Sequence, residues 1–217
     1  MGFRYLRGMT DAAVTAEKLL QINAVKLSPQ NPFTWASGWK SPIYCDNRKI
    51  LSHPFIRDYI KSELSNTVFE KFGEAELIAG VATAGIAWGA LVADQLKLPF
   101  LYVRPKPKEH GLGNQIEGEY KAGQKTVVLE DLVSTGKSSL QAAEALQKEG
   151  LVVIGMVSIF NYGFDAAKQA FEQSGIKLIS LTDYSNLIRS AIAYNYVLPE
   201  QQEVLLKWRQ DPANWPQ

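Results

Sequence analysis

Two adjacent carboxylates, Glu130 and Asp131, follow a short apolar run and precede a turn rich in hydroxyl groups. The segment continues as Leu132-Val133-Ser134-Thr135-Gly136-Lys137-Ser138-Ser139. A carboxylate pair can accept hydrogen bonds from the vicinal hydroxyls of a sugar, or help to hold a hydrated Mg²⁺ ion. The turn can present backbone N–H groups and hydroxyls to a phosphate at the start of a helix, where the helix dipole also favours an anion. Such a segment could hold both ends of a phosphorylated ribose.

Two plainer interpretations compete with a binding role for this segment. Ser134 or Thr135 could simply cap the next helix, and the acidic pair could be a solvated strand end. Capping accounts for the hydroxyls but not for two consecutive carboxylates after four apolar residues, so we favour binding. The Gly-Lys-Ser at 136–138 is also found in P-loops, but a P-loop requires a glycine five positions before its second glycine. That position holds Asp131, which excludes a P-loop.

A second segment whose residues could take part in a reaction is strongly basic. Four potential cations alternate within seven residues, namely Arg104, Lys106, Lys108 and His110, and glycines follow at 111 and 113. They lie in a long irregular connection, 104–123, which is typical of a functional lid. Closure of a basic lid over a crevice would exclude water and stabilise the charge that develops on a polyphosphate leaving group. The alternative is a solvated basic loop, but its position directly after a predicted strand favours function.

Two further segments carry weaker signals. The small residues of 80–85 would allow the backbone to approach an anion closely, although a tightly packed turn has the same composition. In 33–46, aromatic residues alternate with Gly, Lys and Ser, which could form a hood over a flat ring or merely a satellite cluster. The histidines, His53 and His110, lie near no second group of metal-ligand type, so we expect no zinc site.

Alternating elements must position these residues. Buried strands are predicted at 76–81, 99–103, 126–129, 151–160 and 176–180. Helices are predicted between them at 86–96, 138–149, 165–173 and 185–193, and before them near 10–22 and at 53–72, with loops and short strands at 27–50. Continuous apolar strands separated by helices indicate a parallel sheet covered on both faces. The ligand crevice of such a sheet lies beyond the carboxyl ends of its strands.

The composition limits the class of protein. The 217 residues are 46% hydrophobic and 21% charged, as in ordinary globular domains. A net charge of +1 gives no global field for nucleic acid or an anionic membrane. The lone Cys45 fits a reducing compartment, and no apolar run reaches the roughly 18 residues of a membrane span. We therefore expect one cytoplasmic domain with an N-terminal helix and hood at about 10–50, a core at about 53–195 and a tail at 198–217.

The chain resembles type I phosphoribosyltransferases, and among them the bacterial orotate phosphoribosyltransferases. Residues 127–139 match the motif by which that fold binds 5-phosphoribosyl-1-pyrophosphate (PRPP), which identifies the donor but not the acceptor. The resemblance to the orotate enzymes rests on the lid pattern, the 33–44 segment and the 80–85 turn, and it covers about residues 12–195. It implies an α/β fold with a central, mostly parallel sheet flanked by helices, a small N-terminal hood and a mobile basic lid.

The resemblance also implies roles for individual residues. Glu130 and Asp131 would bind the ribose hydroxyls. The rest of the PRPP site would comprise Leu132, Val133, Ser134, Thr135, Gly136, Lys137 and Ser138, with the 5′-phosphate on 134–138, and also Thr83 and Ala84. The lid residues Arg104, Lys106, Lys108 and His110 would meet the pyrophosphate, with Lys108 reaching the neighbouring subunit's site because the family works as a homodimer. Catalytic roles would fall to Lys108, Asp131, Arg104 and His110.

Orotate would lie near Ser134, Lys40 and Tyr44, and Mg²⁺ would be held mainly through PRPP and water, near Asp131. The implied reaction gives orotidine 5′-monophosphate and pyrophosphate, in the synthesis of UMP. The chain departs from many members at Thr83-Ala84, where they carry Tyr-Lys, and at Pro105, where they carry a basic residue. The stretch 160–163 lacks an arginine that some members use to bind the orotate carboxylate. Backbone amides of the hood would bind the carboxylate in its place.

Three other functions are compatible with parts of the pattern. The first is a phosphoribosyltransferase for a purine or another base, because the acceptor depends on the hood. The second is a non-catalytic PRPP-sensing regulator that binds DNA, for which neither the length nor the net charge leaves room. The third is a phosphosugar-binding protein without chemistry, against which the long basic lid is the main evidence.

Overall fold

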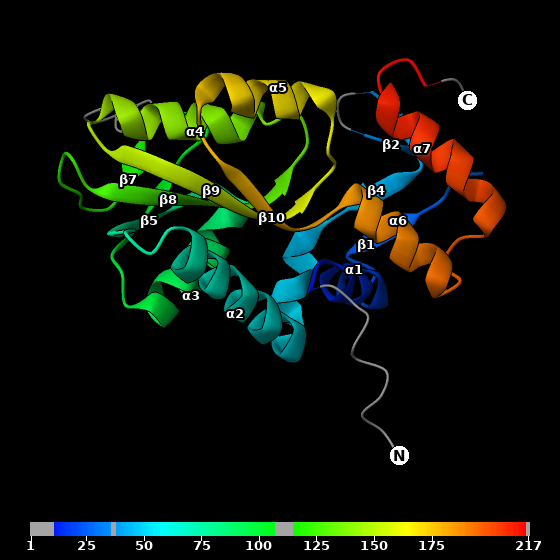
Figure 1. Cartoon of the computed structure of the whole chain (residues 1–217), viewed down its shortest axis with the longest axis horizontal. Coiled ribbons are helices and arrows are strands. Elements are labelled where there is room, and N and C mark those ends of the chain that lie inside the picture. The colour runs from blue at the N-terminus through cyan, green and yellow to red at the C-terminus, as the bar shows by residue number, and fades with distance from the viewer. Residues whose placement is uncertain (1–10, 36–37, 107–114, 216–217) are drawn as a thin grey trace.

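The core of the protein is a six-stranded sheet (Figure 1). The computed structural model describes residues 11–35, 38–106 and 115–215. The strand order is β10 (Leu178–Asp183), β9 (Val152–Asn161), β8 (Lys125–Val133), β5 (Leu77–Val81), β6 (Phe100–Val103) and β7 (Ile116–Glu117). All neighbouring strands are parallel except β7, which is antiparallel to β6. The predicted parallel sheet is therefore confirmed.

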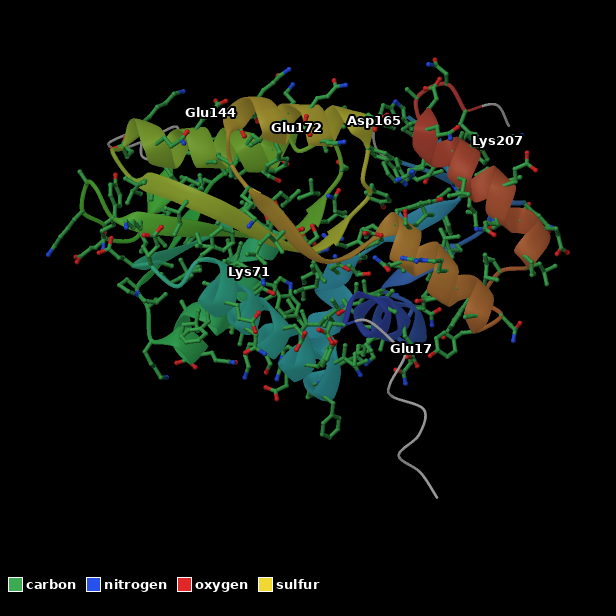
Figure 2. The ribbon with its side chains drawn as sticks, viewed as in Figure 1. Glu17, Lys71, Glu144, Asp165, Glu172 and Lys207 are labelled. Atoms are coloured by element: carbon green, nitrogen blue, oxygen red, sulfur yellow. The ribbon has the colours of Figure 1, made fainter. Side chains whose placement is uncertain are left out.

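Helices cover both faces of the sheet. One face carries α4 (Lys137–Lys148) and α5 (Asp165–Ser174), and the other carries α1 (Asp11–Gln21), α2 (Pro54–Lys71) and α3 (Ala84–Leu96) (Figure 1). α4 and α5 are amphipathic. α4 buries Ala143 and Leu146 against the sheet, while Glu144 projects away from it, as Glu172 does from α5 (Figure 2). Among the described helices, none is both long and apolar enough to cross a membrane.

Short strands form a hood at one end of the sheet. β1 (Val25–Leu27) pairs with β4 (Ile43–Cys45), and β2 (Phe33–Thr34) pairs with β3 (Lys40–Ser41), both antiparallel. The 3₁₀ helix η1 (Asn47–Ser52) then leads to α2. After the sheet, α6 (Tyr184–Ala193), η2 (Pro199–Gln201) and α7 (Gln202–Gln210) place the end of the chain beside the hood (Figure 1). The short strands expected within 27–50 are confirmed.

The structure corrects three sequence-based expectations. The strand predicted to end at Leu129 continues to Val133, because its last residues still pair with β9 at Glu130↔Ser158 and Val133↔Asn161. The connection expected to be irregular from 104 to 123 contains β7. The tail, to which no element was assigned, contains η2 and α7.

The glycines of the turn after β5 are explained by packing. A Cβ atom built on Gly85 would lie 2.5 Å from the backbone oxygen of Leu129, and one built on Gly80 would lie 2.6 Å from the backbone oxygen of Gly85. No carbon–oxygen contact of that length is tolerated without a backbone shift. The start of α3 therefore approaches β8 at a distance that only glycine permits, just before the acidic pair.

We predict that Gly85→Ala lowers the free energy of unfolding by about 3 kcal/mol, because the added methyl group meets rigid backbone. Gly123→Ala is the matched control, since nothing lies within 4 Å of a Cβ there and only its positive φ of +87° is unfavourable. That control should cost about 1 kcal/mol. Urea unfolding of both variants measures the difference, and equal losses would show that the close approach at Gly85 is unimportant.

Candidate active site

The acidic pair lies at consecutive positions within β8, and its two carboxyl groups lie close enough that each shifts the pKa of the other. Glu130 is 6% exposed. Its Oε2 accepts a hydrogen bond of 3.0 Å from Ser139 Oγ of α4, and its Oε1 accepts one of 3.0 Å from the backbone N–H of Asp131. Asp131 is half-buried. Pairing of β8 with β5 ends at Gly80↔Leu129, so one side of the strand is open at the pair.

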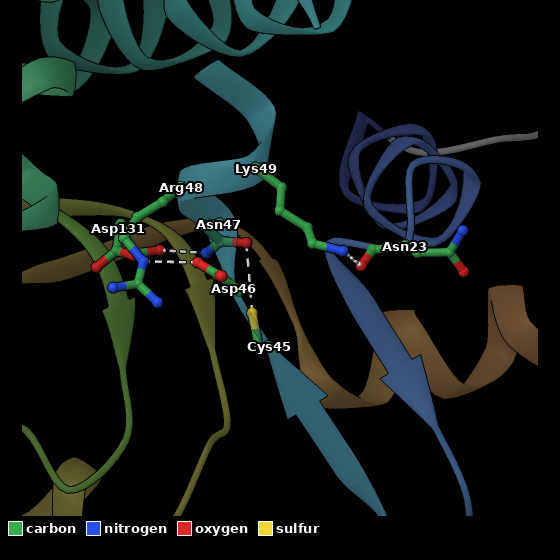
Figure 3. A network of polar contacts seen from close by, with 7 residues as sticks. All are labelled: Asn23, Cys45, Asp46, Asn47, Arg48, Lys49 and Asp131. Carbon is green, nitrogen blue, oxygen red and sulfur yellow. Dashed lines mark hydrogen bonds and ion pairs between the residues drawn. The ribbon is translucent and has the colours of Figure 1, made fainter. Parts of the chain in front are cut away.

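The start of η1 joins the hood to this point of β8 (Figure 3). Asn47 is fully buried, and its Nδ2 donates a hydrogen bond of 2.7 Å to the backbone oxygen of Asp131. The Oδ1 of the same side chain accepts a hydrogen bond of 3.3 Å from Cys45 Sγ. Burial raises the pKa of the Cys45 thiol well above its usual range, so this group is a donor in a structural network and not a nucleophile.

Arg48 brings a positive charge close to Asp131. Its Nε donates a hydrogen bond of 2.6 Å to Asp46 Oδ1, and its guanidinium extends toward Asp131 (Figure 3). The hydrogen bond from Arg48 lowers the pKa of Asp46. The sequence patterns predict no role for Asn47 or Arg48. The available signal is the polar run at 46–48, which directly follows a hood strand but matches no motif.

The environment shifts the protonation of both carboxyl groups. Burial, and after it the charge of the neighbouring Asp131, raise the pKa of Glu130 to about 8. Burial also raises the pKa of Asp131, against the opposing effects of a hydrogen bond with Glu130 and the Arg48 charge. Because Glu130 is the deeper of the two and Arg48 favours the ionised form of Asp131, we assign the proton to Glu130. At neutral pH the pair therefore carries about one negative charge.

The turn after β8 leaves its hydroxyl groups available. The N-cap of α4 is Gly136, which has a φ of +79° and no side chain that could cap the helix. The interpretation that Ser134 or Thr135 serves only as a helix cap is therefore wrong. Ser134 and Thr135 are half-buried, whereas Lys137 and Ser138 are exposed. Leu132 is half-buried and Val133 is buried in the strand. The turn thus presents backbone and hydroxyl groups at the carboxyl edge of the sheet.

Arg104 lies at the base of the predicted lid. Its backbone N–H donates to the oxygen of Gln115 at 2.8 Å, and Gln115 Nε2 donates to the oxygen of Arg104 at 2.9 Å. Its guanidinium forms an ion pair of 3.2 Å with Glu117. Lys106 is exposed at the end of the described stretch. The predicted site residues Lys108 and His110 lie outside the described residues.

The remaining predicted residues come from the β5–α3 turn and the hood. Thr83 is exposed and Ala84 half-buried at the start of α3, after a cis peptide bond between Ala82 and Thr83. Lys40 is half-buried in β3. Tyr44 is 41% exposed, with its ring 5.8 Å from that of Phe33.

The aromatic side chains of the hood lie in two different environments. Trp35 packs into a cluster with Tyr162 and Trp208, whereas Tyr44 stays accessible. Within the described part of the chain, no three His, Cys, Asp or Glu side chains are grouped so that they could hold a metal ion.

Comparisons with known proteins agree on one family. A model of the phosphoribosyl transferase domain matches residues 47–186. The orotate phosphoribosyltransferase of Phocaeicola vulgatus is 57% identical over 200 residues, which cover 92% of this chain and 94% of the relative. That of Listeria monocytogenes serotype 4b is 54% identical over 92% and 96%. The crystal structure of orotate phosphoribosyltransferase from Aeropyrum pernix has a TM-score of 0.73 and 27% identity, and the alignment covers 84% of this chain and 98% of that one.

The raised pKa of Glu130 predicts a pH-dependent stability. The pKa of Glu130 is about 8 in the folded protein and near 4.5 in the unfolded chain. Between these pH values the folded protein retains a proton that the unfolded chain releases. The stabilisation is thus complete below about pH 4.5 and is lost as the pH rises, by up to about 1.4 kcal/mol per pH unit between pH 5 and 8.

Urea unfolding at several pH values, with Glu130→Gln as the comparison, tests this expectation. The variant should lose most of the slope between pH 5 and 8, because its side chain is neutral in both states. Identical slopes in the two proteins would contradict the assignment of the proton to Glu130.

Proposed function

The chain belongs to the orotate phosphoribosyltransferase family, and we propose that its carboxyl edge binds PRPP and orotate and joins N1 of orotate to C1′ of the ribose. The products are orotidine 5′-monophosphate and pyrophosphate, and the reaction is a step of pyrimidine biosynthesis. The assignment of this site rests on one observation. Where β8 separates from β5, the Glu130–Asp131 pair is followed by the start of α4, which has no side-chain cap.

The donor fits this arrangement of groups. Asp131, and Glu130 beside it, would accept hydrogen bonds from the two ribose hydroxyls, while 134–138 would bind the 5′-phosphate with backbone N–H groups and hydroxyls. A protonated Glu130 halves the negative charge that faces the polyanionic substrate. This is the physical benefit of its raised pKa, since two ionised carboxylates would repel a pyrophosphate more strongly.

Two segments of the chain would contact the leaving pyrophosphate. Thr83 and Ala84 would contribute from the β5–α3 turn, and the lid would contribute Arg104, Lys106, Lys108 and His110. A ribosyl centre can pass through an oxocarbenium-like state, so no covalent nucleophile is required. Catalysis then consists mainly of positioning the reactants and stabilising the charge that develops on the pyrophosphate.

We propose that Mg²⁺ is held mainly through PRPP and water, near Asp131. The donor set is compatible, because an ionised carboxylate is the oxygen ligand that this cation prefers, and the Arg48 charge favours ionisation of Asp131. When bound, the ion would offset the negative charge of the leaving group. The protein's own contribution there is to keep one carboxylate charged and in place through Asn47 and β9.

The acceptor would lie beneath the hood, near Tyr44, Lys40 and Ser134. The accessible ring of Tyr44 can contact a flat base, and the Lys40 ammonium can approach an anionic one. We further propose a cytoplasmic homodimer with shared active sites and no nucleic-acid or membrane partner. Phe55 and Phe69 support a subunit interface, because they are 93% and 73% exposed about four turns apart on the same side of α2.

We predict that the purified protein consumes orotate in the presence of PRPP and Mg²⁺, and that chelation of the metal abolishes turnover. Ultraviolet absorbance follows the reaction, with hypoxanthine, adenine and uracil as competing acceptors. Turnover of a purine in place of orotate would contradict the assignment of the hood while preserving the donor site. Binding of PRPP without turnover of any base would indicate a PRPP sensor.

A further inference from the structure

The C-terminal helix α7 is bonded directly to the hood. Trp208 of α7 is fully buried, and its Nε1 donates a hydrogen bond of 3.1 Å to the backbone oxygen of Lys40, 168 residues earlier in the chain. Figure 1 shows α7 lying beside β2. Trp208 lies outside the residues matched by the family model, which end at 186. Lys40 is one of the residues assigned to the acceptor.

The Trp208 ring also joins the hood to the carboxyl edge of the sheet. It meets Trp35 of the hood edge-on at 5.6 Å and Tyr162 at 5.9 Å. The backbone N–H of Tyr162, directly after β9, donates to the oxygen of Val133 at the end of β8 at 3.0 Å. A single side chain therefore contacts both the hood and the segment that follows the acidic strand.

The hood strands need such support because they are very short. β2 and β3 have two residues each and, within the described residues, pair with each other alone. An isolated strand pair is at best marginally stable. Two tryptophans supply bonds to the hood backbone. Trp208 donates to Lys40, and Trp35 Nε1 donates at 3.1 Å to the oxygen of Ile43, next to Tyr44.

From these contacts we infer that Trp208 is a positioning residue for the acceptor: it fixes the backbone at Lys40 and thereby sets where the lysine side chain meets the base. The inference rests on the proposed function, because the role of Lys40 belongs to it. In this view α7 is part of the acceptor side of the active site, although none of its sequence carries a motif.

The structure offers a matched control in Tyr184. Its hydroxyl donates a hydrogen bond of 2.9 Å to the backbone oxygen of Leu205 in α7, and its ring packs 5.5 Å from Trp208. Tyr184→Phe therefore removes one hydrogen bond that holds α7 without touching the hood. Trp208→Phe retains an aromatic ring in the cluster but removes the N–H that reaches Lys40.

Steady-state kinetics of the full-length wild type and both variants test the inference. Trp208→Phe should raise the KM for orotate about 3- to 10-fold, as loss of one hydrogen bond allows, while the KM for PRPP changes less than about 2-fold. Tyr184→Phe should lower the thermal midpoint but leave the KM for orotate within about 2-fold of the wild type. Equal effects of the two variants on the KM for orotate would overturn the inference.

A double-mutant cycle with Lys40→Ala shows whether Trp208 acts through Lys40. This variant keeps the backbone oxygen and removes only the ammonium. In that background, Trp208→Phe should raise the KM for orotate by less than about 2-fold, because there is no side chain left to position. A full additional effect would overturn the inference. Failure of the wild type to convert orotate would instead refute the proposed function, before any variant is compared.

Discussion

The structure depends on the burial of two adjacent carboxyl groups at a place where a strand has lost one of its neighbours. Two buried negative charges in contact are unfavourable, and three contacts reduce the cost. Ser139 and the backbone N–H of Asp131 hydrogen bond to Glu130, and Arg48 lies near Asp131. The retained proton on Glu130 removes most of the remaining repulsion. The same constraint explains why β9 must accompany β8 to Val133, since the pair needs a rigid backbone.

The close packing around this point follows from the same constraint. Glycines at 80 and 85 let α3 begin in close contact with β8. The pairing of β8 with β5 ends at Leu129, where this contact lies. Asn47 fixes η1 to the backbone of Asp131, and η1 in turn holds the end of the hood. On the other side of the hood, Trp208 connects Lys40 to the segment after β9. The proposed donor and acceptor sides thus lie on segments that are far apart in sequence.

Much of this architecture could be predicted from the sequence because it depends on local pattern. Apolar runs separated by amphipathic segments located the five parallel strands and their helices, and the 130–138 motif predicts the centre of the candidate site. The length of β8 could not be predicted, because Glu130 and Asp131 are poor strand residues that only pairing with β9 holds extended. The roles of Asn47, Arg48 and Trp208 could not be predicted for a related reason. Their significance lies in contacts with residues 83 to 168 positions away in the chain, which no local pattern encodes.

¹³C NMR of the glutamate carboxyl groups as a function of pH would show whether a proton-sharing carboxyl pair forms the ribose end of the site. We expect one resonance with a midpoint near 8, absent in Glu130→Gln and displaced when ribose 5-phosphate is added. If all glutamate carboxyl groups titrate below about pH 6, or if ribose 5-phosphate leaves the Glu130 resonance unchanged, the claim is contradicted.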